Sequence, residues 1–168
     1  MKTSKHLQQF VEHVIMEQEQ RPLYTALVVD ALGAMKMRRV IQEQNLDRGL
    51  DGWLSSNIHP AHGNQQLNHH MTITPGALKP ANPLRLRLGQ DVTLHVVGWG
   101  YDTKLGVAAW QIDTVSGFPT KTGVPHVTAM LENDSVKPFK AAKIKNWKKL
   151  PESFAVRGTF QEVFPRER

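Results

Sequence analysis

The sequence predicts an α+β fold built from antiparallel β-sheet. Several segments alternate apolar and polar residues with the period of two that is typical of strands. Apolar residues recur at helical spacing in two other segments, 4–18 and 32–44. Residues 92–112 read as two strands joined by a glycine-containing turn, which predicts a hairpin. At 168 residues and 40% hydrophobic content, the chain is long enough for one compact domain with its own core.

Composition narrows the classes of function. The formal net charge of +6 favours phosphate-bearing or polyanionic partners. The chain has no cysteine, which excludes disulfides and thiolate chemistry. No run approaches the roughly 20 consecutive apolar residues of a membrane span, and the first residues lack the apolar core of a secretory signal. We therefore expect a soluble, cytoplasmic protein that does not associate with membranes.

The chain is predicted to consist of a separate N-terminal unit, residues 1–22, and a main domain, residues 23–168. Helical spacing of apolar residues over 4–18 predicts an amphipathic helix in the first unit. The run Leu23–Asp30 is rich in apolar and β-branched residues, which predicts a buried strand. A helix with one apolar side is predicted for Leu32–Gln44, and a glycine near its start lowers its helix propensity.

The regular pattern is lost between Leu46 and Leu67, where glycine, proline, asparagine and glutamine are frequent. Irregular connections of this length in a compact domain are often functional. Within this segment, Trp53 has two interpretations. It is predicted to plug the core, and the alternative is a platform on which a nucleobase stacks.

Alternation returns in the second half of the chain. Leu84–Leu88 and Val92–Trp99 are predicted strands, Gly98–Lys104 is a predicted turn, and Leu105–Ile112 is the predicted return strand of the hairpin. Phe154–Val163 is predicted to be the final strand. It is preceded by a basic segment that contains Lys137, Lys140, Lys143, Lys145, Lys148 and Lys149.

Two short stretches, Asn68–Ile73 and Val124–Ala129, echo each other. Each contains the pattern His, apolar, Thr, apolar: His70-Met71-Thr72-Ile73 and His126-Val127-Thr128-Ala129. On a strand, this pattern sends the His and the Thr to one face and the apolar residues to the other. Two such strands facing each other would place two imidazoles and two hydroxyls around one pocket. Such a set can move protons and hold oxygens at a phosphate.

The two His-x-Thr motifs, 56 positions apart, resemble the signature of the 2H phosphoesterase superfamily. The chain is similar in particular to the cyclic phosphodiesterase-like modules associated with RNA ligases and tRNA ligases. The resemblance covers roughly residues 23–164. It implies two pseudo-symmetric lobes of antiparallel β-sheet with flanking helices, with the motifs facing each other across a central cleft. It also implies a reaction that needs no metal and no cofactor.

The resemblance implies that His70 and His126 form an acid–base pair and that Thr72 and Thr128 hold the phosphate. An imidazole suits both tasks, because its ordinary pKa is near 6.5. The expected reaction is hydrolysis of a 2′,3′-cyclic phosphate on RNA or on a nucleotide, as in RNA end processing. We assign His126 as the base and His70 as the acid, although the sequence itself does not decide between the two assignments.

Further residues are candidates for binding the substrate. Tyr24, Trp99 and Tyr101 could stack on a nucleobase. Lys104, the late lysines and the pair Arg85 and Arg87 could guide a phosphate backbone.

Several alternatives stay open from the sequence. Within the enzyme class, the substrate could be a cyclic oligonucleotide signal of bacterial immunity, as for small phage enzymes of the 2H type. The chain could also be a non-catalytic RNA-binding module. A cluster of His59, His62, His69 and His70 could ligate a transition metal. The simplest alternative keeps both motif histidines as structural residues, with threonine present for its β propensity.

Overall fold

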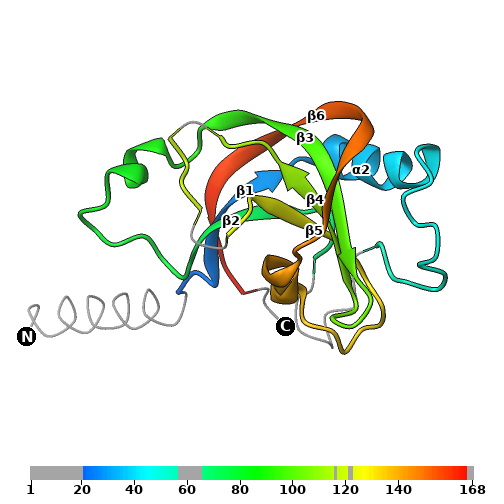
Figure 1. The fold of residues 1–168 in the computed structure, drawn as a ribbon. Coiled ribbons are helices and arrows are strands. Elements are labelled where there is room, and N and C mark those ends of the chain that lie inside the picture. Colours follow the sequence, from blue (N-terminus) through cyan, green and yellow to red (C-terminus); the bar gives the residue numbers. More distant parts are fainter. Residues whose placement is uncertain (1–20, 57–65, 116, 121–122, 166–168) are drawn as a thin grey trace, which may run out of the picture.

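The computed structural model describes residues 21–56, 66–115, 117–120 and 123–165. These residues form one six-stranded antiparallel sheet in the order β2-β1-β6-β3-β4-β5 (Figure 1). The elements in chain order are β1 (Tyr24–Val29), α2 (Ala31–Glu43), β2 (His70–Pro75), the 3-10 helix η2 (Pro83–Arg87), β3 (Asp91–Asp102), β4 (Val107–Ile112), β5 (His126–Leu131), the 3-10 helix η3 (Pro138–Lys143) and β6 (Trp147–Val163). The expected antiparallel sheet is therefore confirmed, and the few helices beside it are compatible with the expected α+β class.

The long strand β6 connects the two halves of the sheet. Its 17 residues pair with β1 over Gly158–Val163 and with β3 over most of its length. Beyond these partners, β2 and β5 form the two edges of the sheet. The sheet curls so that these edges come together, since Asn68 N donates to Thr128 O over 2.8 Å. The described strands thus curve into a nearly closed barrel, as the ribbon shows (Figure 1).

The main hydrophobic core fills one face of this curled sheet. Side chains from all parts of the sheet are fully buried in it, including Leu27, Met71, Leu94, Trp110 and Phe160. A second, smaller cluster joins β4 and β5 to the η3 region, and its members are Leu67, Val107, Ala109, Leu131, Ala141 and Ile144. The two faces of β4 and β5 are therefore both covered over part of their length.

The predicted first strand and helix are confirmed as β1 and α2. Asp30 caps the helix, because its Oδ1 accepts a hydrogen bond of 2.7 Å from Gly33 N. Gly33 is explained by close packing against the sheet. A Cβ at this position would lie 2.7 Å from Cγ1 of Val29 and 3.0 Å from Cβ of Val156. The glycine that weakens the helical pattern is thus what lets α2 approach β1 and β6.

The strand expected at Leu84–Leu88 is wrong, because this segment forms η2. Pro83 takes the first helical position, where its fixed φ suits a helix. The side chain of Asn82 caps the turn by accepting from Leu84 N over 2.9 Å. Leu86 is 92% exposed, so the alternating leucines do not share a buried face. Local capping therefore outweighs the period-two pattern here.

The hairpin is confirmed, but its turn lies further along than expected. β3 continues through Gly98 and Gly100 to Asp102, so the expected turn at Gly98–Lys104 is mostly strand. Residues 103–106 make the turn, and Oδ1 of Asp102 accepts the backbone N–H groups of Lys104 and Leu105. The expected final strand at Phe154–Val163 is likewise too short, because β6 begins at Trp147.

Some expectations fall outside the described residues, namely the N-terminal helix over 4–18 and the histidines His59 and His62. The described parts of the 46–67 connection contain no helix or extended strand, only an isolated bridge between Leu54 and Leu131. Trp53 is half-buried and packs against the main core, in agreement with the plug interpretation. None of the helices that the structure describes is long and apolar enough to cross a membrane.

Candidate functional site

The two His-x-Thr stretches lie on the strands that form the edges of the sheet. On β2, Met71 and Ile73 are buried in the main core. On β5, Val127 and Ala129 are buried in the same core. The histidine and threonine of each motif therefore point to the opposite face, as the alternation of a strand requires.

Asn68 ties the two motif strands together. It is fully buried, and its backbone N–H donates to Thr128 O over 2.8 Å. Its Nδ2 donates to Ser55 O at 3.0 Å and to Ala129 O at 3.4 Å. Its Oδ1 accepts from Nε1 of Trp110 at 2.7 Å. A single asparagine thus fixes the start of β2 against β4 and β5, which brings the motifs side by side.

His70 lies in a cluster of aromatic and imidazole rings. The ring of Tyr24 stacks on it, with centroids 4.3 Å apart and an interplanar angle of 19°. Tyr24 Oη is 3.4 Å from Nδ1 of His70, and Nδ1 of His69 is 3.0 Å from the same nitrogen. These contacts occupy Nδ1 of His70. Nε2 has no hydrogen-bond partner among the described residues, so it is the nitrogen that can serve a ligand.

The electrostatic environment of His70 disfavours its charged form. Burial is the main cause that lowers its pKa, to about 3, and the positive charges of His69 and His126 lower it further. His70 is therefore neutral at pH 7 in the unliganded protein. The effect of His126 also indicates that the two motif histidines are close enough to interact. An anion bound between them would raise both pKa values.

His126 has a defined tautomer. Its Nδ1 lies 2.7 Å from Val124 O, and a carbonyl oxygen can only accept, so Nδ1 carries a proton. Burial lowers the pKa of His126, and the hydrogen bond to Val124 opposes that shift. In the neutral ring, Nε2 therefore holds the lone pair. This arrangement suits a general base.

The two threonines are not equivalent. Oγ1 of Thr128 donates to Pro138 O over 3.2 Å, which links β5 to η3. Oγ1 of Thr72 has no hydrogen-bond partner among the described residues, while the carbonyl of Thr72 accepts from Thr120 Oγ1 at 3.2 Å. Thr72 is thus ready to donate to a ligand. Thr128 would first have to release Pro138.

The residues expected to bind substrate fall into two places. Tyr24 lies against His70 in the motif site. Trp99, Tyr101 and Lys104 instead line a separate groove at the β3–β4 hairpin. Trp99 is largely buried and packs edge-on against Trp110 of the core, with centroids 4.8 Å apart, so little of its ring is accessible.

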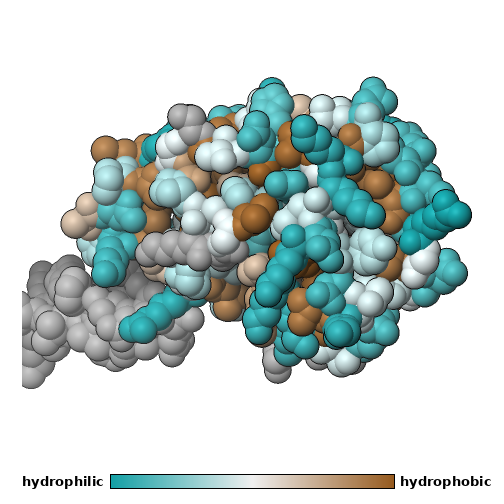
Figure 2. Space-filling model, in the orientation of Figure 1, coloured by the Kyte–Doolittle hydropathy of each residue, from teal (hydrophilic) through white to brown (hydrophobic). Residues whose placement is uncertain are grey.

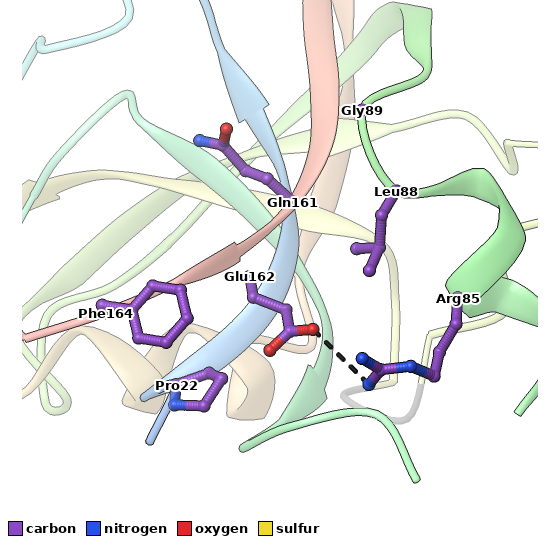
Figure 3. Close-up of a pocket in the computed structure, with 7 residues that line it drawn as sticks. All are labelled: Pro22, Arg85, Leu88, Gly89, Gln161, Glu162 and Phe164. Atoms are coloured by element: carbon purple, nitrogen blue, oxygen red, sulfur yellow. Dashed lines mark ion pairs between the residues drawn. The ribbon is translucent and has the colours of Figure 1, made fainter. Parts of the chain in front are cut away.

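The arginines of η2 also have local roles. Arg85 donates to Leu78 O at 3.1 Å and lies 3.6 Å from a carboxylate oxygen of Glu162. This ion pair borders a pocket of about 540 Å³ between η2 and the end of β6 (Figure 3). Arg87 lies over the ring of Phe118, with its guanidinium carbon 3.8 Å from the centroid. These contacts give both guanidinium groups structural partners.

The expected alternative of a metal centre concerns His59, His62, His69 and His70. The first two lie outside the described residues. Within residues that the structure describes, no group of three or more His, Asp or Glu side chains has an arrangement that could hold a metal ion.

Sequence reasoning missed the roles of Asn68, His69 and Trp110. Asn68 stands two residues before His70 of the first motif, but nothing local shows that its partners come from β4 and β5. The local signal is the residue type itself, since asparagine is among the few residues that readily adopt a left-handed conformation, and Asn68 has a φ of 55°.

A scan against protein-family models finds no match to the chain, and a search of curated proteins finds no similar sequence.

Proposed function

We propose that this protein is a metal-independent phosphodiesterase that opens 2′,3′-cyclic phosphates on RNA ends or nucleotides. In this proposal, β1 and β2 with the end of β6 form one lobe. The strands β3, β4 and β5 with the start of β6 form the other lobe. The two His-x-Thr motifs then lie at the junction of the lobes, in the manner of the 2H phosphoesterases.

One observation carries the proposal. The two motifs are far apart in sequence, yet Asn68 N donates to Thr128 O and joins the start of one motif strand to the other. Each strand turns its histidine and threonine away from the core. If the two motifs occurred by coincidence, there would be no reason to expect them on adjacent edge strands with their histidines and threonines turned away from the core.

The hydrogen bonds support a division of labour between the histidines. His126 holds its proton on Nδ1, so Nε2 can take a proton from the attacking water. As water attacks phosphorus, the bond from phosphorus to one ribose oxygen breaks. His70, charged in the presence of the phosphate, gives its Nε2 proton to that leaving oxygen. The hydroxyl of Thr72 donates to a non-bridging oxygen.

The low pKa of His70 is compatible with this acid role once the ligand is considered. Burial and the neighbouring imidazoles by themselves disfavour the cation of His70. A bound phosphodiester brings a negative charge within hydrogen-bonding range and favours the cation. The stacked ring and the hydroxyl of Tyr24 further fix the imidazole in place. The substrate itself therefore prepares the acid.

The test is hydrolysis of a 2′,3′-cyclic nucleotide, and of a short RNA with that end, in the presence of EDTA. The natural protein is compared with His70→Ala and His126→Ala. His95→Ala is the matched control, because His95 is an exposed histidine on β3. We expect turnover by the natural protein and by the control, and loss in both motif variants. Turnover that disappears in EDTA, or that survives both motif substitutions, would contradict the proposal.

A further inference from the structure

A second polar groove lies at the end of the β3–β4 hairpin. It has a volume of about 610 Å³ and lies between the hairpin and the start of β6. Its lining includes two indoles, a phenol and three lysines: Trp99, Trp147, Tyr101, Lys104, Lys145 and Lys148. Over η3 and the hairpin end, hydrophilic side chains surround hydrophobic atoms (Figure 2). The groove is therefore both aromatic and basic.

Close packing fixes the aromatic wall of the groove. Trp147 pairs with Gly100 across β3 and β6. A Cβ at Gly100 would lie 2.7 Å from Cε3 of Trp147 and 2.8 Å from Cγ2 of Ile144, so only glycine leaves room for the indole. Nε1 of Trp147 also donates to Ile144 O over 3.1 Å. The ring is thus held rigidly while it stays half-exposed.

The side chains that line the groove carry a net positive charge. Lys104, Lys145 and Lys148 are exposed. Within the described part of the chain, none of these ammonium groups forms an ion pair. Asp102 is the acidic residue of the lining, and its carboxylate accepts backbone N–H groups in the hairpin turn. This net charge therefore favours an anionic ligand.

One side of the groove, formed by Trp147, lies on the same face of the sheet as the motif site, whereas Tyr101 follows Gly100 on β3 and points toward the other face at the end of the hairpin. Thr128 pairs with Ala109, Ala109 with Gly100, and Gly100 with Trp147. Directly paired residues point to the same face, and neighbouring strands lie about 4.8 Å apart. Three such steps separate Trp147 from Thr128 by about 14 Å. A flexible polyanion of a few units can reach both places.

We propose that this groove binds single-stranded RNA, with bases stacked on Tyr101 and Trp147 and phosphates contacted by the three lysines. Aromatic platforms beside tracks of positive charge are how proteins hold single strands without reading their sequence. The link to the motif site rests on the proposed function and makes a polymer the substrate class. The binding step itself does not depend on catalysis.

The experiment measures fluorescence anisotropy of a labelled single-stranded RNA of about 10 nucleotides, a length within the range that such grooves accommodate. The RNA ends in a 3′-hydroxyl, so the full natural chain binds it without any turnover. Tyr101→Ala, Lys104→Ala and Lys145→Ala are compared with Lys79→Ala, an exposed lysine outside the groove. We expect Tyr101→Ala to weaken binding at least about fivefold, as loss of one stacked base does.

The salt dependence provides a second readout. Each groove lysine removed should reduce the slope of log affinity against log salt by about 0.7, whereas Lys79→Ala should leave it unchanged. Equal weakening by Lys79→Ala, no binding of single strands, or equal affinity for double-stranded RNA would overturn the inference. Binding that depends on the groove in a protein that hydrolyses no cyclic phosphate would refute only the proposed function. The two failures are thus distinguishable.

Discussion

Nε1 of Trp110 donates a hydrogen bond of 2.7 Å to Oδ1 of Asn68, and both residues are fully buried. Trp110 belongs to the main core, whereas Asn68 lies two residues before β2, the strand of the first motif. This bond therefore connects the packing of the barrel to the position of His70. Buried polar pairs of this kind cost much when one partner is removed, because the other stays unsatisfied.

Replacing Asn68 with alanine should destabilise the protein. The substitution leaves the indole N–H of Trp110 and two carbonyl oxygens without their partner, which predicts a loss of about 2–4 kcal/mol in the free energy of unfolding. The matched control is Asn45→Ala. Asn45 has the same φ of 55° but is exposed, so it reports the backbone cost alone. Urea unfolding measures the loss in the free energy of unfolding of each variant. Equal losses in the two variants would show that the buried hydrogen bonds of Asn68 do not stabilise the fold.

The free energy of unfolding should fall as the pH falls below about 6.5. The pKa of His70 is lowered to about 3 in the folded protein, whereas the unfolded chain has the ordinary value near 6.5. Between these values the unfolded chain binds a proton that the folded protein does not. One such group contributes a slope of at most about 1.4 kcal/mol per pH unit. His126 adds to the same trend, because burial also lowers its pKa.

Urea unfolding between about pH 7 and pH 4 measures this slope. His70→Asn should have a shallower slope than the natural protein. A saturating nucleoside monophosphate should also reduce the slope, since its charge raises the pKa of the histidines. If His70→Asn and the natural protein had the same slope, the burial of a neutral imidazole at this position would be wrong.

The two threonines should respond differently to substitution by valine. Thr72→Val removes a hydroxyl that has no partner among the described residues, so it should slow turnover by about 100-fold with little effect on stability. Thr128→Val also removes the hydrogen bond to Pro138 O, so it should cost about 1 kcal/mol of stability as well. Steady-state kinetics and urea unfolding separate the two effects. Unchanged turnover in both variants would remove the threonines from the mechanism.

Local patterns predicted the elements that bear the motifs. β1, α2, β2 and β5 were all expected from alternation, helical spacing and turn residues, because burial of one face imposes those periods. The pattern failed at Leu84–Leu88, where a cap and a proline decide the conformation. It also failed at Gly98 and Gly100, which allow close packing within a strand rather than a turn.

Long-range features could not be predicted in the same way. The first residues of β6 are Trp147 and two lysines, followed by a buried leucine and Pro151. This run has no strand periodicity, and its pairing with β3 depends on the rest of the sheet. The contact between Asn68 and Thr128 depends on how far the sheet curls. The motifs therefore suggest that the two histidines lie close together, but only the three-dimensional fold determines whether they do.

The central claim is that His70 and His126 act as one catalytic pair. The most direct measurement is kcat/KM for a 2′,3′-cyclic nucleotide in EDTA, for His70→Ala, His126→Ala and the double variant. We expect each single variant to lose at least about 100-fold, as removal of a general acid or base does. The double variant should lose no more than about tenfold beyond the single ones, because residues that act as a unit are not additive. Losses that simply multiply in the double variant would show that the two histidines act independently and would contradict the claim.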